Sequence, residues 1–283
     1  MARRLYATLS RGGLSSATDE AVRLLFRLKG STAPMLRASV KSLVPPPLRY
    51  AIRQLATEFE IARLHRASSK EARRAYADAG PLSLNLASGH HPKSGWVNVD
   101  LFHQTADLRL DLRRPLPFRD NSARYIYVEH FFEHLEYPNV LESMGWDHEG
   151  PDTPSEALQF LRECRRILAP SGILDIVVPD AEGMIGEYFR RRDVPESEVD
   201  WWGPAWCDNR MHRLNYLFRQ GREHKYAYDE DTLSQVLRKA QFEDVRRRAF
   251  NPAMDAPNHI IGSLCMTARK QPNERTMELS AVS

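Results

Sequence analysis

The stretch SLNLASGHHPKSGWVNVD, from Ser83 to Asp100, places two short apolar runs around a turn of small residues. Such an alternation predicts a strand, a loop and a second strand. The turn carries one glycine, Gly89, where a dinucleotide-binding turn has three. Nine residues separate Leu86 from Trp96, whereas a helical crossover between parallel strands needs about a dozen or more. The stretch is therefore either an unusual cofactor-binding turn or an ordinary strand, loop and strand.

The composition is that of an ordinary soluble globular protein: 283 residues, 42% of them hydrophobic and 27% charged. This length suits one large α/β domain with additions, or two small domains. There is no apolar run of about 18 residues, so no transmembrane helix is predicted. The three cysteines, Cys164, Cys207 and Cys265, show neither metal-ligand spacing nor a disulfide framework. Cysteine usage of this kind favours a reducing compartment, and we expect a cytoplasmic protein.

Charge divides the chain into two parts, although the net charge is only +3. Residues 1–80 contain 15 Lys and Arg against 6 Asp and Glu, whereas the remainder contains 25 against 31. We therefore expect a basic helical N-terminal extension over 1–80, a main domain over 81–272 with an aromatic insertion at about 181–228, and a disordered tail over 273–283. The extension either touches an anionic membrane surface or docks on its own acidic domain.

Strand-like and helical runs alternate from Ser83 onward. Strands are expected at Ser83–Ala87, Trp96–Asp100, Ala106–Leu112, Arg124–His130, Gly172–Asp180, Phe242–Phe250 and His259–Arg269. This order predicts a Rossmann-like α/β fold, with a mostly parallel seven-stranded sheet whose last strand is antiparallel. In such sheets, ligands bind at the carboxyl ends of the strands, beside the topological switch point.

Two helices of the main domain carry clear end signals. The first is expected at Thr153–Leu168, because Thr153 and Glu156 have capping-box spacing and Pro154 falls at the first helical position. The second is expected at Asp229–Ala240, which starts with an acidic cap. Its face toward the core would carry Leu233, Val236 and Leu237.

Acidic residues end two of the expected strands. Asp100 is placed to accept hydrogen bonds from a ribose diol, as the acid at the end of the second strand does in dinucleotide folds. Asp111 is placed to bind an adenine amino group, while Leu112 packs on the ring. Each aspartate alone is equally a solvated turn residue. Together with the glycine-containing first turn, the two acids favour a nucleoside site.

Three segments resemble successive motifs of class I S-adenosylmethionine-dependent methyltransferases: LNLASGHHPKSGWVNVD, DLRRPLPFRDNSARYIYVEHFFEHL and EALQFLRECRRILAPSGILDIVVPD. The resemblance is to the type 11-like methyltransferase domain group and spans about Leu84 to Asp180. A weaker resemblance, to the late helix and the strand that follows it, lies at HKYAYDEDTLSQVLRKAQFEDV. The resemblance implies S-adenosyl-L-methionine as the cofactor and methyl transfer as the activity.

The resemblance also implies roles for the matched positions. Its cofactor-binding residues are Asn85, Ala87, Ser88 and Gly89 against the methionyl part, Asp100 at the ribose with Leu101 next to it in the chain, Asp111 and Leu112 at the adenine, and Glu129 on the methyl-transfer side. Asn85 stands where many members have an acid, and Ala87 stands where the group prefers glycine. An alanine is tolerable there where the backbone φ is negative, and Gly89 remains for the tightest approach.

The catalytic candidates are His130 and His134, because transfer of a methyl group to an alcohol benefits from a general base with a pKa near the working pH. His134 is equally suited to cap or pack a turn. Residues 201–228 contain three tryptophans and several arginines, which suit a saccharide ring and anionic groups or a lid with its own small core. The histidines His90, His91, His212 and His224 lack ligand spacing, so no metal site is predicted.

The resemblance thus implies an S-adenosylmethionine-dependent methyltransferase, and relatives of this pattern, which are often associated with surface polysaccharide or glycolipid synthesis, favour an oxygen of a saccharide or glycolipid-type acceptor. Methylation of a small aromatic or lipid-like metabolite is an alternative, as is a non-catalytic binding or scaffold protein on the same fold. The acidic body argues against nucleic acid, since a phosphate-tracking groove is basic. Because the first crossover has no room for a helix, we expect the basic helix ending near Ala79 to cover the bare sheet face.

Overall fold

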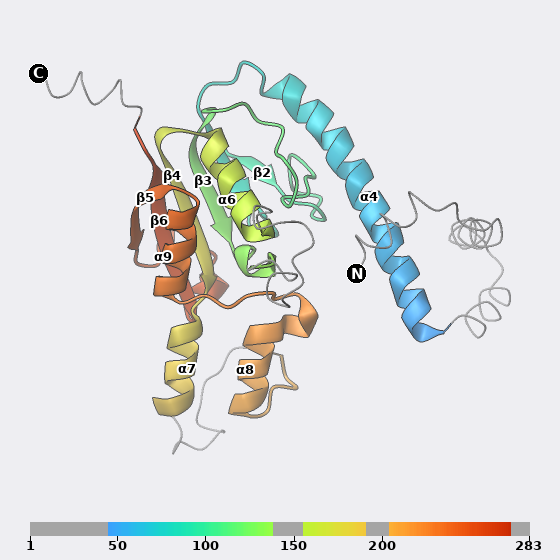
Figure 1. The fold of residues 1–283 in the computed structure, drawn as a ribbon, viewed down its shortest axis with the longest axis vertical. Coiled ribbons are helices and arrows are strands. Elements are labelled where there is room, and N and C mark those ends of the chain that lie inside the picture. Colours follow the sequence, from blue (N-terminus) through green and yellow to red (C-terminus); the bar gives the residue numbers. More distant parts are fainter. Residues whose placement is uncertain (1–44, 138–154, 191–203, 273–283) are drawn as a thin grey trace, which may run out of the picture. The chain divides into compact units, whose positions relative to one another are not determined.

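The computed structural model describes residues 45–137, 155–190 and 204–272 (Figure 1). The chain divides into two compact units, Met1–Arg63 and Leu64–Ser283, so the division falls inside helix α4 (Pro46–Ala75). None of the described helices has the length and apolar character needed to span a membrane. The domain bounds expected from the sequence stay a prediction.

The second unit is built on one six-stranded sheet with the order β2-β1-β3-β4-β6-β5 (Figure 1). The strands are β1 (Leu82–Leu86), β2 (Val97–Val99), β3 (Ala123–Glu129), β4 (Leu168–Pro179), β5 (Phe242–Arg247) and β6 (Ser263–Lys270). Strands β2, β1, β3 and β4 are parallel, and β6 is antiparallel to both of its neighbours. The prediction of a Rossmann-like, mostly parallel sheet with an antiparallel last strand is therefore confirmed.

Within the described residues the sheet has six strands rather than the predicted seven, because residues 106–112 form only one isolated bridge to β2. Two amides of this segment donate to side chains of α4. Arg109 N lies 3.0 Å from Ser68 Oγ, and Asp111 N lies 3.1 Å from His65 Nδ1. Leu108 is the residue that pairs with β2, so the amides of Arg109 and Asp111, which alternate with it, lie on the edge away from β2 and bond to α4.

The helices are α6 (Glu156–Ile167), α7 (Ala181–Arg190), α8 (Arg210–Arg219) and α9 (Glu230–Lys239), with short 3-10 turns η1 (Phe132–His134), η3 (Gln220–Arg222) and η4 (Pro257–His259). Helix α6 begins two residues after Pro154, and its N-cap is Ser155, whose Oγ accepts from Leu158 N at 3.3 Å. The cap expected at Thr153 is therefore wrong, and Thr153 itself lies outside the described residues.

Helix α9 follows its prediction closely. Asp229 is its N-cap, and the Asp229 carboxylate accepts from Thr232 N at 2.8 Å. Leu233, Val236 and Leu237 are fully buried, as their shared helical face predicts. The acidic cap and the apolar spacing are local signals, which is why the sequence alone locates this helix.

The sheet has two unlike faces because side chains alternate along each strand. One face, called the helix face, packs with α6 and α9 into the main core, to which the strands contribute Leu84, Leu86, Val97, Val99, Ile126, Val128, Leu174, Ile176, Val178, Leu264, Met266 and Ala268. The opposite face, called the loop face, carries a smaller cluster of Tyr127, Val177 and Cys265 with Trp96, Tyr125 and Met254 packed against it.

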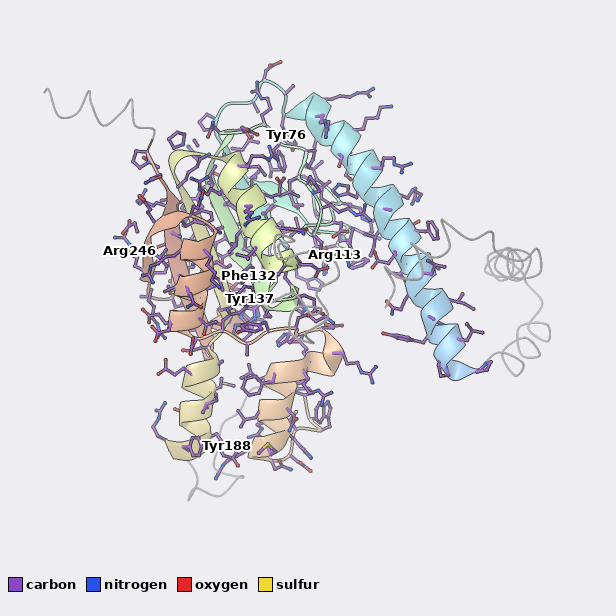
Figure 2. The ribbon with its side chains drawn as sticks, viewed as in Figure 1. Tyr76, Arg113, Phe132, Tyr137, Tyr188 and Arg246 are labelled. Atoms are coloured by element: carbon purple, nitrogen blue, oxygen red, sulfur yellow. The ribbon has the colours of Figure 1, made fainter. Side chains whose placement is uncertain are left out.

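The loop face is the one that lacks the usual helix, and the end of α4 does not cover it. Ala72 and Tyr76 (the latter labelled in Figure 2) belong to the core of the helix face. The Tyr76 ring lies 6.1 Å from that of Phe118. The loop face is covered instead by residues 88–96 and 248–257. The expected cover by the basic helix is therefore wrong, because polar side chains on this face bond to loop backbone rather than to a helix.

Candidate functional site

The first turn leaves β1 through a left-handed backbone. Ala87 has a φ of 55° and Gly89 a φ of 48°. The φ at Ala87 is therefore positive rather than the negative value at which an alanine is free of strain, and glycine would be favoured at this position for a steric reason. For an L-residue with a Cβ atom, the left-handed conformation costs about 1–2 kcal/mol. The chain accepts this strain to turn sharply at the carboxyl edge of the sheet.

Replacing Ala87 with glycine is expected to raise the free energy of unfolding by about 0.5–1 kcal/mol, since relief of the left-handed strain exceeds the extra entropy of an unfolded glycine. Urea denaturation measures the change. The matched control is Ala67→Gly, at an exposed position inside α4, which should lose about 1 kcal/mol. A loss of stability in both variants would contradict the strain at Ala87.

Asp100, at the end of β2, lies directly beside this turn. Its Oδ2 accepts from Gly89 N at 3.1 Å, and its Oδ1 accepts from Phe102 N at 2.8 Å and His103 N at 2.9 Å. A carboxylate has about four acceptor positions, so about one remains, on Oδ2. A Cβ added at Gly89 would meet no atom within 4 Å. The predicted ribose acid and the predicted turn are thus adjacent, with open space at the glycine.

Ser88 and Asn85, the other predicted cofactor residues of the first turn, have different hydrogen-bond environments. Ser88 is buried, and its Oγ has no hydrogen-bond partner among the described residues. Such an orphaned hydroxyl is unfavourable unless a ligand or water completes it. Asn85 instead points to the loop face, where its Nδ2 donates to Asn98 Oδ1 at 2.9 Å and to His91 O at 3.0 Å. Its predicted role against the cofactor stays a prediction.

Asp111 is a buried carboxylate held by two arginines. Oδ1 accepts from Arg113 Nε at 2.9 Å, and Oδ2 accepts from Arg114 Nε at 3.1 Å (Arg113 is labelled in Figure 2). Burial alone would raise the pKa of Asp111, but these bonds outweigh it and hold the pKa below its ordinary value. Leu112 is part of the main core, and Leu101 offers its carbonyl to Arg109. Adenine binding by Asp111 and Leu112 stays a prediction.

Glu129 and His130 end β3 and contact the connection between β5 and β6. Glu129 Oε1 accepts from Ala256 N at 2.9 Å and lies 3.0 Å from His259 Nδ1. Burial opposes ionisation of Glu129, but the hydrogen bond with His259 and the amide of Ala256 hold its pKa below the ordinary value. His130 has a φ of 49°, lies 2.9 Å from Ser263 Oγ through Nε2, and stacks on His259 at 3.8 Å. No motif in the sequence singles out His259 or Ser263.

Glu133, in η1, is a deeply buried acid near the strand ends. Its side chain is 2% exposed, and neither carboxylate oxygen accepts a hydrogen bond within the described part of the chain. Three imidazoles face Oε1: His130 Nδ1 at 3.5 Å, and His134 Nε2 and His224 Nε2 at 3.9 Å each. Burial lowers the pKa of His224. The motif EHFFEHL contained Glu133, but its spacing alone did not mark it as a site residue.

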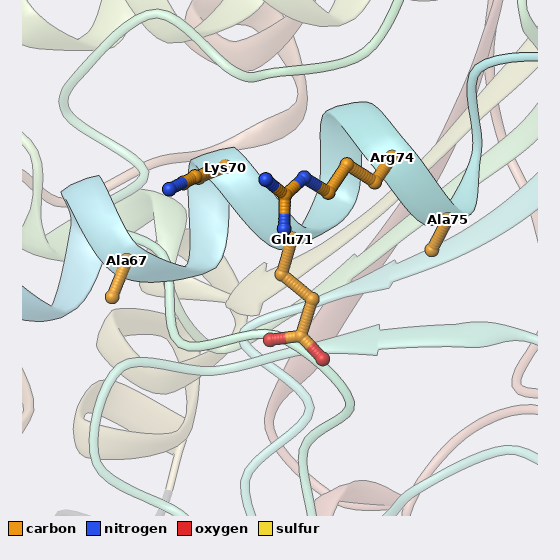
Figure 3. A pocket seen from close by; sticks show the side chains of 5 residues that line it. All are labelled: Ala67, Lys70, Glu71, Arg74 and Ala75. Carbon is orange, nitrogen blue, oxygen red and sulfur yellow. The ribbon is translucent and has the colours of Figure 1, made fainter.

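Two surface hollows lie elsewhere. One of about 420 Å³ runs along α4 and is lined by Ala67, Lys70, Glu71, Arg74 and Ala75 (Figure 3). The other, of about 490 Å³, lies between residues 90–96 and 252–257 of the loop face. Neither is lined by Asp100, His130 or Glu133. The candidate site is therefore the set of strand ends itself rather than either hollow.

Comparison with known proteins gives similarity in structure only. No protein-family model matches the sequence, and no curated protein matches it. A methyltransferase from Thermotoga maritima, described as a possible histamine N-methyltransferase, is 15% identical with a TM-score of 0.38, covering 78% of this chain and 96% of that one. A methyltransferase from Archaeoglobus fulgidus is 13% identical with a TM-score of 0.38, covering 77% and 99%.

A further solved structure carries a bound cofactor product. Phosphoethanolamine N-methyltransferase 2 of Haemonchus contortus, in complex with S-adenosylhomocysteine, is 12% identical with a TM-score of 0.36, covering 72% of this chain and 52% of that one. The first two structures are described as S-adenosylmethionine-dependent methyltransferases, and the third is described as an N-methyltransferase. These likenesses concern the course of the backbone and leave open what this chain binds.

Proposed function

We propose that this chain is an S-adenosylmethionine-dependent methyltransferase that methylates an oxygen of a saccharide or glycolipid-type acceptor. The observation that carries the proposal is the hydrogen bond from Gly89 N to the Asp100 carboxylate at 3.1 Å. It unites the turn after β1 with the acid after β2, while β3 lies on the other side of β1. The strand order switches there, and open α/β sheets bind their ligands at such a point.

The residues of this corner fit a nucleoside with a polar tail. Asp100 retains one acceptor position for a ribose hydroxyl, Gly89 leaves open space, and the buried Ser88 hydroxyl lacks a partner within the described residues. These residues would hold the ribose and the methionyl part. Bound S-adenosylmethionine would supply an electrophilic methyl group.

The chain itself would supply a base. His130 stands at the end of β3, across the switch point from the first turn, and is held between Ser263 and the ring of His259. It would take the hydroxyl proton of the acceptor as that oxygen is methylated, which is the general-base role expected of an imidazole. His134, the second candidate base, lies nearer to Glu133 and His224.

The insertion between β4 and α9 supports a ring-shaped acceptor. Trp206 is 58% exposed beside α8, and its ring lies 6.0 Å from that of Tyr216. Exposed aromatic faces with polar edges suit a sugar ring. The same surface suits a small aromatic or lipid-like metabolite, which is the alternative acceptor. The basic residues of 1–80 would add a peripheral contact with an anionic membrane.

Replacing Asp100 with asparagine is expected to weaken S-adenosylhomocysteine binding by about 10- to 100-fold, because a hydrogen bond to a charged group is worth about 1.5–3 kcal/mol. Isothermal titration measures the affinity. Asp231→Asn, at an exposed first-turn acid of α9, is the matched control and should bind as the wild type does. Equal affinity in all three proteins, or no binding by the wild type, would overturn the proposed cofactor site.

The acceptor is tested separately with methyl-labelled S-adenosylmethionine and two panels, one of saccharides and one of small aromatic and lipid-like compounds. Label in the saccharide panel supports the proposed acceptor, and label only in the second panel supports the alternative. Tight binding of S-adenosylhomocysteine without transfer to either panel favours a binding or scaffold protein on this fold.

A further inference from the structure

Glu133 presents a buried carboxylate that the described residues leave without a hydrogen bond. The residue is 1% exposed, and both Oε atoms are inaccessible to solvent. A buried carboxylate is normally paired with a cation, bonded to several donors or bound to a metal. The nearest groups are nitrogen atoms of histidines, at 3.5 Å or more.

Two of these histidines turn an unprotonated ring nitrogen toward the Glu133 carboxylate. His134 Nδ1 lies 3.2 Å from Glu223 O, and His224 Nδ1 bonds to Leu217 O. A carbonyl oxygen only accepts hydrogen bonds, so each Nδ1 must carry the proton. In a neutral ring the lone pair then resides on Nε2, the atom that faces Glu133 in both histidines. Metal-bound histidines are oriented in this way by their second nitrogen.

The three donor groups converge closely. One ligand atom from each of Glu133, His134 and His224 lies within 4.8 Å of the others, and each Nε2 is 3.9 Å from Oε1. The two rings meet edge to face, with centroids 5.0 Å apart. Ligands of a tetrahedral zinc ion stand about 3.3 Å from one another. Small side-chain movements would therefore bring the three atoms into coordination.

Backbone hydrogen bonds hold this cluster together across the fold. Glu133 O accepts from Lys225 N at 2.7 Å and from Tyr226 N at 3.2 Å, which fixes the segment bearing His224 against η1. The same segment is joined to the end of β4 by the bridge between Asp180 and Tyr228. The donors therefore stand on two anchored segments rather than on free loop tips, as a preorganised site requires.

We propose that Glu133, His134 and His224 bind a divalent transition-metal ion. Two imidazole nitrogens and one carboxylate favour zinc and its neighbours in the first transition row over magnesium or calcium, which prefer oxygen ligands. The His134 side chain is 27% exposed, whereas that of His224 is 6% exposed. The site opens past His134, where a coordination position remains for water or for an oxygen of a substrate. General-base action then falls to His130.

The test uses the untagged full chain, stripped with a chelator and then equilibrated with Zn²⁺ in the presence of a weak competing chelator. The wild type is expected to retain about one zinc ion per chain, as three protein ligands at one site require. The variants Glu133→Gln and His224→Asn should bind zinc at least tenfold more weakly. The matched control is His212→Asn, because His212 is an exposed histidine paired with Asp208, and it should bind as the wild type does.

Three outcomes would overturn the metal site: a wild type that retains no zinc, a Glu133→Gln protein that retains it fully, or a loss in His212→Asn equal to that in His224→Asn. Thermal unfolding gives a second readout, since Zn²⁺ should raise the Tm of the wild type and of His212→Asn but not that of Glu133→Gln. The metal site does not rest on methyl transfer. Binding of S-adenosylhomocysteine to Glu133→Gln tests the proposed function separately and should equal that of the wild type.

Discussion

Replacing Arg248 with methionine is expected to lower the free energy of unfolding by about 3–5 kcal/mol, which corresponds to a fall in Tm of about 10 °C. Arg248 joins two buried acids of the loop face: its Nε donates to Asp175 Oδ1 at 2.8 Å, and its Nη2 donates to Asp255 Oδ1 at 2.6 Å. The acid side chains are 3% and 0% exposed. Removal of the guanidinium would leave two buried charges that hydrogen bonds from Tyr125 and Tyr127 only partly satisfy.

The matched control for this variant is Arg247→Met at the neighbouring position. Arg247 is 48% exposed and pairs with Asp180 at 3.1 Å and Glu230 at 3.6 Å. Ion pairs of this exposure contribute about 0–1 kcal/mol, so this variant should differ little from the wild type. Thermal and urea denaturation measure both variants. Equal small losses at the two positions would contradict the central role of Arg248 on the loop face.

The deficit of Arg248→Met should shrink as the pH falls from 7 toward 4. In the wild type, burial alone would raise the pKa of Asp255, but Arg248 holds it below its ordinary value, so Asp255 contributes stability that is lost only at low pH. Burial raises the pKa of Asp175 even with Arg248 present. Without Arg248 both acids would take up protons more readily in the folded state, and acid would relieve the unpaired charges. A pH-independent deficit would contradict this account.

Replacing His130 with asparagine is expected to lower the rate of labelled methyl transfer by about 10²–10⁴-fold, the usual contribution of a general base. Asparagine tolerates the left-handed backbone at this position, where φ is 49°, but it cannot accept the acceptor's proton. The affinity for S-adenosylhomocysteine should stay unchanged because the cofactor residues are intact. Transfer rates are measured on the acceptor that takes the label.

Two results separate a base from a structural role for His130. Asp231→Asn, at the exposed first-turn acid of α9, should transfer at the wild-type rate, and the His130→Asn variant should lose kcat with an unchanged KM for the acceptor. A His130→Asn protein with an unchanged rate would remove His130 from the reaction. A variant with weakened S-adenosylhomocysteine binding would show a role in positioning instead.

Local patterns in the sequence identified much of the framework. The acidic cap and the apolar spacing locate α9, and the alternation of apolar runs locates the six strands. The small-residue turn and Asp100 are correctly recognised as neighbours, since parallel strands bring their carboxyl ends to one edge. Each of these features depends on residues close in the chain or on the period of a regular element.

Contacts between distant segments decided the rest. Residues 106–112 have the composition of a strand, but within the described residues they form only one isolated bridge to β2, and two of their outward-facing amides bond to Ser68 and His65 of α4. The end of α4 joins the helix face through Ala72 and Tyr76, while loops satisfy the polar loop face. Local sequence patterns do not identify the hydrogen-bond partner of a backbone amide when that partner lies about forty residues away in the chain.

The sequence by itself determined the order of strands and helices, the first turn and the acid at its side, because propensity, capping and periodicity act over a few residues. Only the tertiary structure decided the partners of the charged groups. Glu133 and His224 lie far apart in the chain, and hydrogen bonds from Lys225 and Tyr226 to Glu133 O bring them together. Their proximity therefore depends on contacts between distant segments, which are a property of the whole fold.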